Sequence, residues 1–343
     1  MPRARKCWKT IWQRLKDILS MSQKQTSDAV DTVRLEQFRK KREEWLSCLN
    51  GEDLHSIWKQ QSSLLWDYAL FLTIRELRKE AAENPATGVG FNVPVLRLFE
   101  AGFAVIQATG IRRLTEKQWR DRSGHVIPSK RVISLRALVD DIRENRELLT
   151  REVYLACHDL PFDPAPAKQR FFDRITTSGQ GFAYEGMDTN GPEAWGASEK
   201  AHELFDKLSE KTPASRSRDD LVSPTRFDLL DSKIKSCEDV CVLTDKFIAH
   251  AADPVSRAGL KQEQTTLSLS RLAECHQAML QVADFIGGPL LQDSMSAGLP
   301  APQFNLLENL DKVWVNEDGL EKAREHWQRY ADEIEKWRET SLM

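Results

Sequence analysis

The sequence lacks several features that would point to a function class directly. No apolar run approaches the roughly 20 residues that a membrane-spanning helix requires, and no Gly-rich phosphate-binding loop follows a strand-like segment. Its 49 basic and 52 acidic residues leave a net charge of only −3 over 343 residues, so no overall field favours nucleic acid. These absences exclude a membrane-spanning chain and argue against a P-loop or dinucleotide-binding enzyme.

The six cysteines do not indicate a disulfide framework. Residues 1–20 lack the unbroken apolar centre of a secretion signal, because charged residues from Lys9 to Asp17 interrupt it. Without an export signal we expect reduced thiols and a cytoplasmic protein. Cys237 and Cys241 fall in an apolar stripe, where thiols ordinarily pack rather than bind zinc. We therefore expect no metal and no cofactor.

Residues 1–22 are predicted to form a basic amphipathic helix. The first 20 residues hold six basic side chains and one acid, a net charge of +5, so the rest of the chain carries −8. Such a helix can lie on an anionic membrane or dock on an acidic partner. The alternatives are that Met21 is the true start or that the helix packs on its own acidic body. We favour these alternatives over membrane binding.

Helical periodicity dominates the chain and predicts an all-α fold. Gly51 is expected to cap the first helix in a left-handed conformation. Asn92 and Ser134 are expected to cap two others at their N-termini, the first with Pro94 in its opening turn. The predicted helices cover residues 28–50, 54–84, from 92 onward, 134–158, 226–253, 265–287, 303–315 and 318–340.

The middle of the chain differs from the rest. Five of the sixteen glycines fall between residues 177 and 200, which excludes regular helix there. We interpret residues 177–225 as a long flexible insertion broken by one short helix near 194–210. The principal helical domain is then expected to cover residues 28–255, and residues 256–343 are expected to form a C-terminal helical extension packed on it.

The segment TDKFIAHAADP at 244–254 is the strongest candidate for chemistry. At 100° per residue, His250 lies opposite the apolar stripe and in line with Asp239, Leu243 and Lys246. The helix should end before Pro254, and a histidine at a helix C-terminus suits proton transfer near neutral pH. The alternative is that His250 and Lys246 only cap the last carbonyls. The stripe itself consists of Phe227, Leu230, Ile234, Cys237, Cys241, Thr244 and Ile248.

This segment resembles the abortive-infection branch of the HEPN superfamily, all-α domains of bacterial defence and toxin systems. The resemblance is to a core over roughly residues 30–255. The stretches that carry it are DYALFLTIRELRKEA (67–81), VLRLFEAGFAVIQATGIRRLTE (95–116) with VISLRALVDDI (132–142), and TDKFIAHAADP (244–254).

The resemblance implies a metal-independent endoribonuclease acting as a homodimer on RNA. His250 matches the family's histidine, which assists proton transfer, and Asp245 matches its polar position. Thr244 stands where the family has an arginine, and threonine cannot supply a guanidinium to a phosphate. Lys246 or Arg257 could substitute as a cation.

Two function classes follow. The first is a defence-type HEPN ribonuclease, in which Arg112 and Arg113 could also meet RNA phosphates, although cations at a helix C-terminus need no ligand to explain them. The second is a catalytically silent HEPN-like scaffold that binds a protein partner. The missing arginine favours the second class, and the spacing of Asp245 and His250 favours the first.

Overall fold

The computed structural model describes residues 31–83, 92–178, 188–293, 298–312 and 316–339. Within these ranges the chain forms helices and turns but no β-strand; two isolated antiparallel bridges join Arg120 to Val126 and Thr150 to Leu221. The predicted all-α fold is confirmed. No helix in the described ranges is long and apolar enough to cross a membrane. The predicted helix at 1–22 lies outside them.

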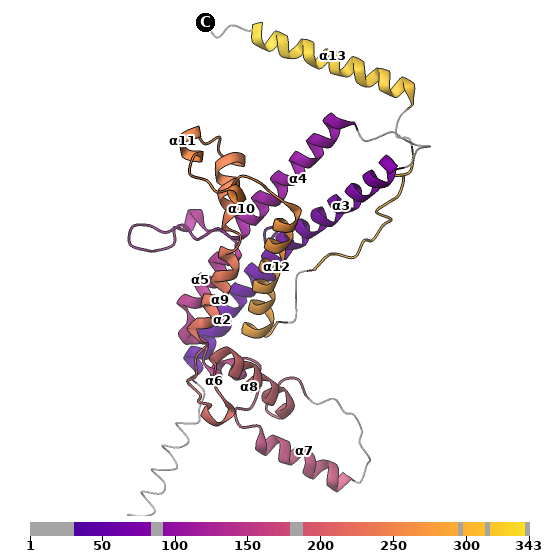
Figure 1. Ribbon diagram of the computed structural model, residues 1–343. Helices are drawn as coiled ribbons and strands as arrows, with labels where there is room; N and C mark the ends of the chain where they lie inside the picture. The colour runs from indigo at the N-terminus through magenta and orange to yellow at the C-terminus, as the bar shows by residue number, and fades with distance from the viewer. Residues whose placement is uncertain (1–30, 84–91, 179–187, 294–297, 313–315, 340–343) are drawn as a thin grey trace, which may run out of the picture. The chain divides into compact units, whose positions relative to one another are not determined.

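The chain divides into two compact units, Met1–Leu299 and Pro300–Met343 (Figure 1). The second unit contains α13 (Glu317–Glu339). The helices of the first unit are α2 (Thr32–Asn50), α3 (Ile57–Glu83), α4 (Val93–Leu114), α5 (Leu135–Glu144), α6 (Arg151–Ala156), α7 (Ala165–Ser178), α8 (Trp195–Ser209), α9 (Pro224–Lys235), α10 (Glu238–Leu243), α11 (Pro254–Arg257) and α12 (Leu269–Phe285).

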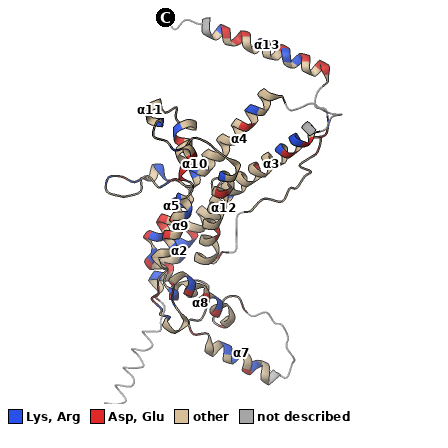
Figure 2. Cartoon of the chain, in the orientation of Figure 1, with Lys and Arg blue, Asp and Glu red and all other residues tan. Residues whose placement is uncertain are grey.

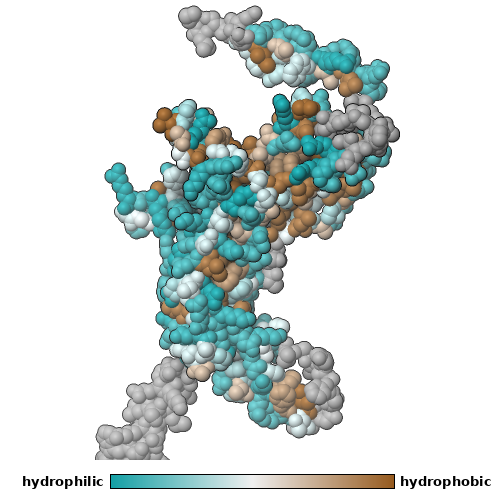
Figure 3. All heavy atoms as spheres, viewed as in Figure 1, coloured by the Kyte–Doolittle hydropathy of each residue, from teal (hydrophilic) through white to brown (hydrophobic). Residues whose placement is uncertain are grey.

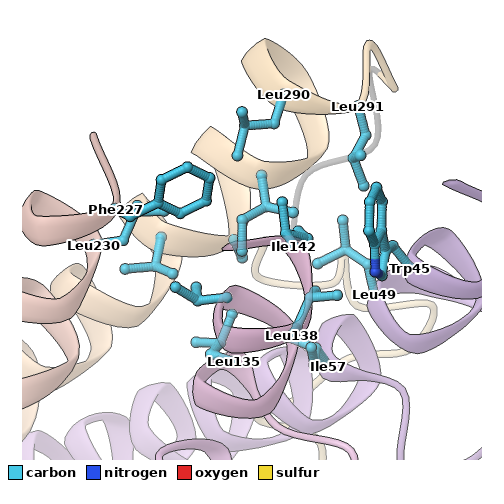
Figure 4. Packing of buried hydrophobic residues seen from close by; sticks show 14 of the residues in the cluster. Trp45, Leu49, Ile57, Leu135, Leu138, Ile142, Phe227, Leu230, Leu290 and Leu291 are labelled. Carbon is cyan, nitrogen blue, oxygen red and sulfur yellow. The ribbon is translucent and has the colours of Figure 1, made fainter. Parts of the chain in front are cut away.

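The core of the first unit lies where α2, α3, α5, α9 and the chain after α12 converge (Figure 4). Trp45 of α2 is buried there, and its indole N–H donates to Asp141 Oδ2 at 2.6 Å. Ile142 of α5 is fully buried among its neighbours. Each fully buried side chain of this size contributes about 1.5–3 kcal/mol relative to an exposed one. From this core α3 and α4 run away side by side (Figure 1).

Two of the three predicted caps form as expected. The Asn92 side chain accepts from Val95 N at 3.3 Å, and Ser134 Oγ accepts from Ala137 N at 3.0 Å. Gly51 differs: it follows the last residue of α2, but its φ of −65° is not left-handed. A Cβ at Gly51 would lie 2.4 Å from the Ser47 carbonyl oxygen, so close backbone approach is what requires glycine here.

Some predicted helices are interrupted or missing. The predicted helix at 134–158 is divided into α5 and α6. The division follows Asn145, whose side-chain amide donates to Asp141 O at 2.8 Å and caps the C-terminus of α5. Residues 303–312 form turns rather than the predicted helix. Phe304, Leu307 and Leu310 of that segment are exposed, so little apolar burial offsets the entropy lost in ordering a helix there.

The predicted flexible insertion is, for residues 188–225, a packed part of the fold. The short helix expected near 194–210 is α8, and its Phe205 is buried in the core. Arg151 of α6 is 0% exposed and forms ion pairs with Asp206 at 2.8 Å and Asp220 at 2.9 Å. These two ion pairs attach residues 188–225 to α6. Local amino-acid composition cannot indicate such a contact, because Arg151 lies outside the segment.

The predicted boundary at 255/256 also differs from the structure. The apolar side of α12 is buried in the first unit, so residues 256–299 belong to the principal domain. Among its buried side chains are Leu272, Met279 and Val282. The separate C-terminal unit therefore begins at Pro300, and its helix α13 has an exposed apolar side.

Candidate functional site

The predicted motif helix at 226–253 is divided by its own backbone geometry. α9 ends at Lys235, α10 covers Glu238–Leu243, and a π-helical turn follows at Thr244–Ile248. Ala249 N donates to Thr244 O at 2.7 Å, five residues back rather than four. The extra residue of a π turn rotates everything after it relative to the preceding helix. The register that aligned His250 with the upstream polar residues is therefore lost.

Thr244 is held by the fold from both sides. Its hydroxyl lies 2.7 Å from Val240 O in its own helix and 3.2 Å from Ala108 O of α4, and it donates toward both carbonyls. A threonine hydroxyl commonly bonds to the carbonyl four residues earlier inside a helix, and the π turn begins at this residue. The residue is 1% exposed. As the apolar stripe predicted, position 244 faces the core.

Asp245 points to α4 instead of toward His250. Arg112 Nε donates to Asp245 Oδ1 at 2.9 Å, and Arg112 Nη1 lies 3.2 Å from Glu116. The hydrogen bond that Arg112 donates to Asp245 raises the pKa of Arg112 above its ordinary value. These three side chains lie in a cleft of about 400 Å³. The other residues lining it are Thr115, Lys117, Gln118, Trp119, Arg120, Glu238 and Cys241.

The rest of the predicted polar face is dispersed. Arg271 of α12 donates two hydrogen bonds of 2.6 Å to the Asp239 carboxylate. These hydrogen bonds raise the pKa of Arg271 above its ordinary value. Lys246 Nζ donates to Ser256 Oγ at 2.9 Å, and Leu243 is buried. His250 follows the π turn as an exposed loop residue. The structure does not assemble Asp239, Lys246 and His250 into one site.

The cations proposed to meet RNA lie on separate elements. Arg112 is engaged by two acids, Arg113 is exposed near the end of α4, and Arg257 of α11 lies over the Phe247 ring at 5.5 Å. Basic and acidic residues are interspersed along the helices rather than gathered in one region (Figure 2). Binding to a phosphate backbone favours concentrated positive charge, which the described residues do not present.

Cys237, Cys241 and Cys275 lie against sulfur or hydroxyl neighbours. Hydrogen bonding with Cys275 and burial raise the pKa of Cys237, and Cys241 Sγ lies 3.1 Å from Thr115 Oγ1. Over the described ranges there is no group of three or more His, Cys, Asp or Glu side chains placed to hold a metal ion. Cys237 and Cys275 act as core residues.

Sequence reasoning missed a polar chain that joins α3, α4 and α12. His276 Nε2 lies 2.8 Å from Gln107 Oε1, and Gln107 Nε2 donates to Leu64 O at 3.0 Å. Burial lowers the pKa of His276 to about 4, so the imidazole is neutral at physiological pH. The sequence shows no helical pattern that singles out His276, because its partner lies 169 residues away.

Comparison with family models, curated proteins and solved structures finds no match to this chain.

Proposed function

We propose that this chain is a catalytically silent helical scaffold that binds a protein partner. The observation that carries the proposal is the burial of Thr244, the position at which a HEPN-like ribonuclease would need its arginine. A guanidinium at position 244 would enter the core beside the Ala108 carbonyl instead of a phosphate site. Asp245 is neutralised by Arg112, and His250 is exposed beyond the helix.

The partner surface we propose is the α3–α4 arm, defined as residues 71–80 of α3 and 93–106 of α4. Inside the arm Phe71 stacks on Phe103, with ring centroids 3.7 Å apart, and lies 5.5 Å from the Phe99 ring. Outside it, Leu98 is 75% exposed. The other exposed large apolar side chains of the arm are Leu72, Leu77, Val93, Val95, Val105 and Ile106.

Apolar side chains gather over α3 and α4 in the space-filling view (Figure 3). Single exposed apolar residues are ordinary, but a contiguous apolar patch on a folded domain marks an interaction site. The arm is held in shape by its own phenylalanines, so the patch is not a product of a loose helix end. This supports a preformed protein-binding surface.

The occupant we propose is an amphipathic helix with acidic flanks. A shallow groove between the two helices is lined by Phe71, Ile74, Leu96 and Phe99, with Arg75, Arg78 and Glu100 also lining it. An apolar ridge of a partner helix fits such a groove at intervals of three and four residues. Arg75 and Arg78 are the two cations of the groove and Glu100 is its one acid, and Arg78 pairs with Glu100 at 3.6 Å. The positive charge of Arg75 therefore favours an acidic side chain on the partner.

A labelled peptide tests this surface. The probe is a helical peptide of about 20 residues with leucines on one face and glutamates on the others, and its counterpart has lysines in place of the glutamates. Fluorescence anisotropy should show tighter binding of the glutamate peptide. Leu96→Glu, at a leucine that lines the groove, should weaken it by about tenfold or more. The matched control Leu229→Glu, at an exposed leucine of α9, should change it by less than about twofold.

Two results would overturn the partner surface. One is equal affinity of wild type and Leu96→Glu for the glutamate peptide, because the apolar contact would then lie outside the groove. The other is tighter binding of the lysine peptide, because the charge argument for Arg75 would be reversed.

A metal-independent ribonuclease is the second candidate function. The observation that favours it is the guanidinium of Arg112, which lies 2.9 Å from the motif's Asp245 although the sequence lacks an arginine at 244. Purified chain with cellular RNA and EDTA, scored for cyclic-phosphate ends, separates the two candidates. The scaffold predicts equal, background-level ends for wild type and His250→Ala. Cleavage that His250→Ala abolishes would favour the ribonuclease.

A further inference from the structure

Within the C-terminal unit, the described residues leave the apolar face of helix α13 exposed. Trp327 is 76% exposed, and its neighbours on this face are exposed by more than a third. Tyr330 and Trp337 contact each other edge to face, with ring centroids 6.0 Å apart. We call the face the α13 seam. It consists of Leu320, Ala323, Trp327, Tyr330, Ile334 and Trp337.

The spacing of the seam is that of a coiled coil. Its members follow one another at intervals of three, four, three, four and three residues, which is a 3.5-residue repeat over α13. The stripe is also narrow, because flanking positions such as Arg324, His326 and Glu333 are charged or polar. A helix packed on a globular core usually carries a wider stripe, whereas two apolar positions in seven fit one facing helix.

We propose that α13 pairs with α13 of a second copy in an antiparallel coiled coil. In a fully overlapped antiparallel pair, Leu320 faces Trp337, Ala323 faces Ile334, and Trp327 faces Tyr330. Every layer but the central aromatic one then combines a smaller with a larger side chain, as close packing requires. A parallel pair would set Ala323 against its own copy and Trp327 against its own copy, leaving one layer underfilled and another crowded.

This pairing goes beyond the proposed function and uses a different surface. The homodimer implied by the HEPN resemblance would join through the face with Asp239, Lys246 and His250, which the structure does not assemble. The seam needs no residue of that face and none of the α3–α4 arm. An isologous pair of this kind closes on itself and gives a dimer rather than a filament.

Light scattering after size exclusion tests the association with the full chain at roughly 50 µM. The expected mass is twice the 39.3 kDa of one chain. Trp327→Glu should halve this mass, because it places a charge in the middle of the seam. Arg329→Glu, an exposed position off the seam, is the matched control and should remain dimeric. A monomeric wild type, or a dimer that survives Trp327→Glu, overturns the proposal.

A charge rescue tests the antiparallel register. Ala323→Glu and Ile334→Lys should each dissociate the dimer. The double variant should associate again, because the new carboxylate at position 323 of one copy would face the new ammonium at position 334 of the other in both symmetric layers. In a parallel pair the double variant would set like charges against each other and stay monomeric, which would overturn the antiparallel arrangement. Far-UV circular dichroism equal to wild type for each variant shows that the first unit stays folded.

Discussion

Helices α5 and α13 are both amphipathic, and they differ in how far their own units bury their apolar faces. The apolar residues of α5, among them Leu138 and Ile142, are buried between α2, α9 and the chain after α12. The corresponding residues of α13, among them Trp327 and Ile334, are exposed. Periodicity locates the apolar face in both helices, and tertiary contacts alone decide what covers it. An uncovered face with good periodicity is therefore where a second chain is expected.

The largest expected effect concerns the buried charge that ties α8 to α6. Arg151→Met should lower the free energy of unfolding by about 4 kcal/mol, because Asp220 would lose its partner inside the fold. Urea unfolding followed by circular dichroism measures it. Arg170→Met breaks the exposed pair of Arg170 with Glu193 and should have no measurable effect. Equal effects of the two substitutions would show that residues 188–225 do not depend on Arg151.

The same substitution in the two helices sharpens the comparison directly. Ile142→Ala in α5 should lower the free energy of unfolding of the first unit by about 3 kcal/mol, because it leaves a cavity at a fully buried site. Ile334→Ala in α13 should leave that unfolding transition unchanged and lower only the affinity of the dimer. Parallel urea titrations and dilution series of both variants provide the measurement. A shift of the first unit's transition by Ile334→Ala would mean that α13 contributes to its core.

The smallest of these effects is a dependence of stability on pH. The pKa of His276 falls from 6.5 to about 4 on folding, so the unfolded state binds the proton more readily between these values. Stability from the neutral imidazole is fully present above about pH 6.5 and is lost as pH falls toward 4. By about pH 5 the loss should reach roughly 2 kcal/mol relative to neutral pH.

The variant His276→Gln isolates this effect, because its side chain does not titrate. Wild type should lose about 2 kcal/mol more than the variant between neutral pH and about pH 5. Identical pH dependence of the two proteins would show that folding does not lower the pKa of His276.

The sequence predicted those features that depend on neighbours within one or two helical turns. Asn92 and Ser134 were identified as caps because the amides they accept from lie three residues ahead. The stripe predicted the burial of Thr244 for the same reason. The Thr244–Ala108 contact and the Arg112–Asp245 pair could not be predicted, because the partners lie more than 130 residues apart in the sequence. No periodic pattern indicated the π turn at 244–248 either.

The bounds of the predicted insertion and C-terminal extension differ from the structure for a related reason. Glycine content between 177 and 200 indicated a flexible insertion, but Arg151 supplies the charge that Asp206 and Asp220 need to pack. The predicted register of the candidate site assumed one continuous α-helix from Arg226 to Asp253. The π turn after Leu243 shifts that register relative to Asp239.

The central claim is that position 244 faces the core and cannot serve a phosphate site, and Thr244→Arg tests it most directly. The variant places an arginine at the position where the HEPN motif has one. Our account predicts a loss of about 3 kcal/mol or more in the free energy of unfolding, against about 1 kcal/mol for Thr244→Val, and no cleavage of RNA. A Thr244→Arg variant that keeps wild-type stability and cleaves RNA in a His250-dependent manner would contradict it.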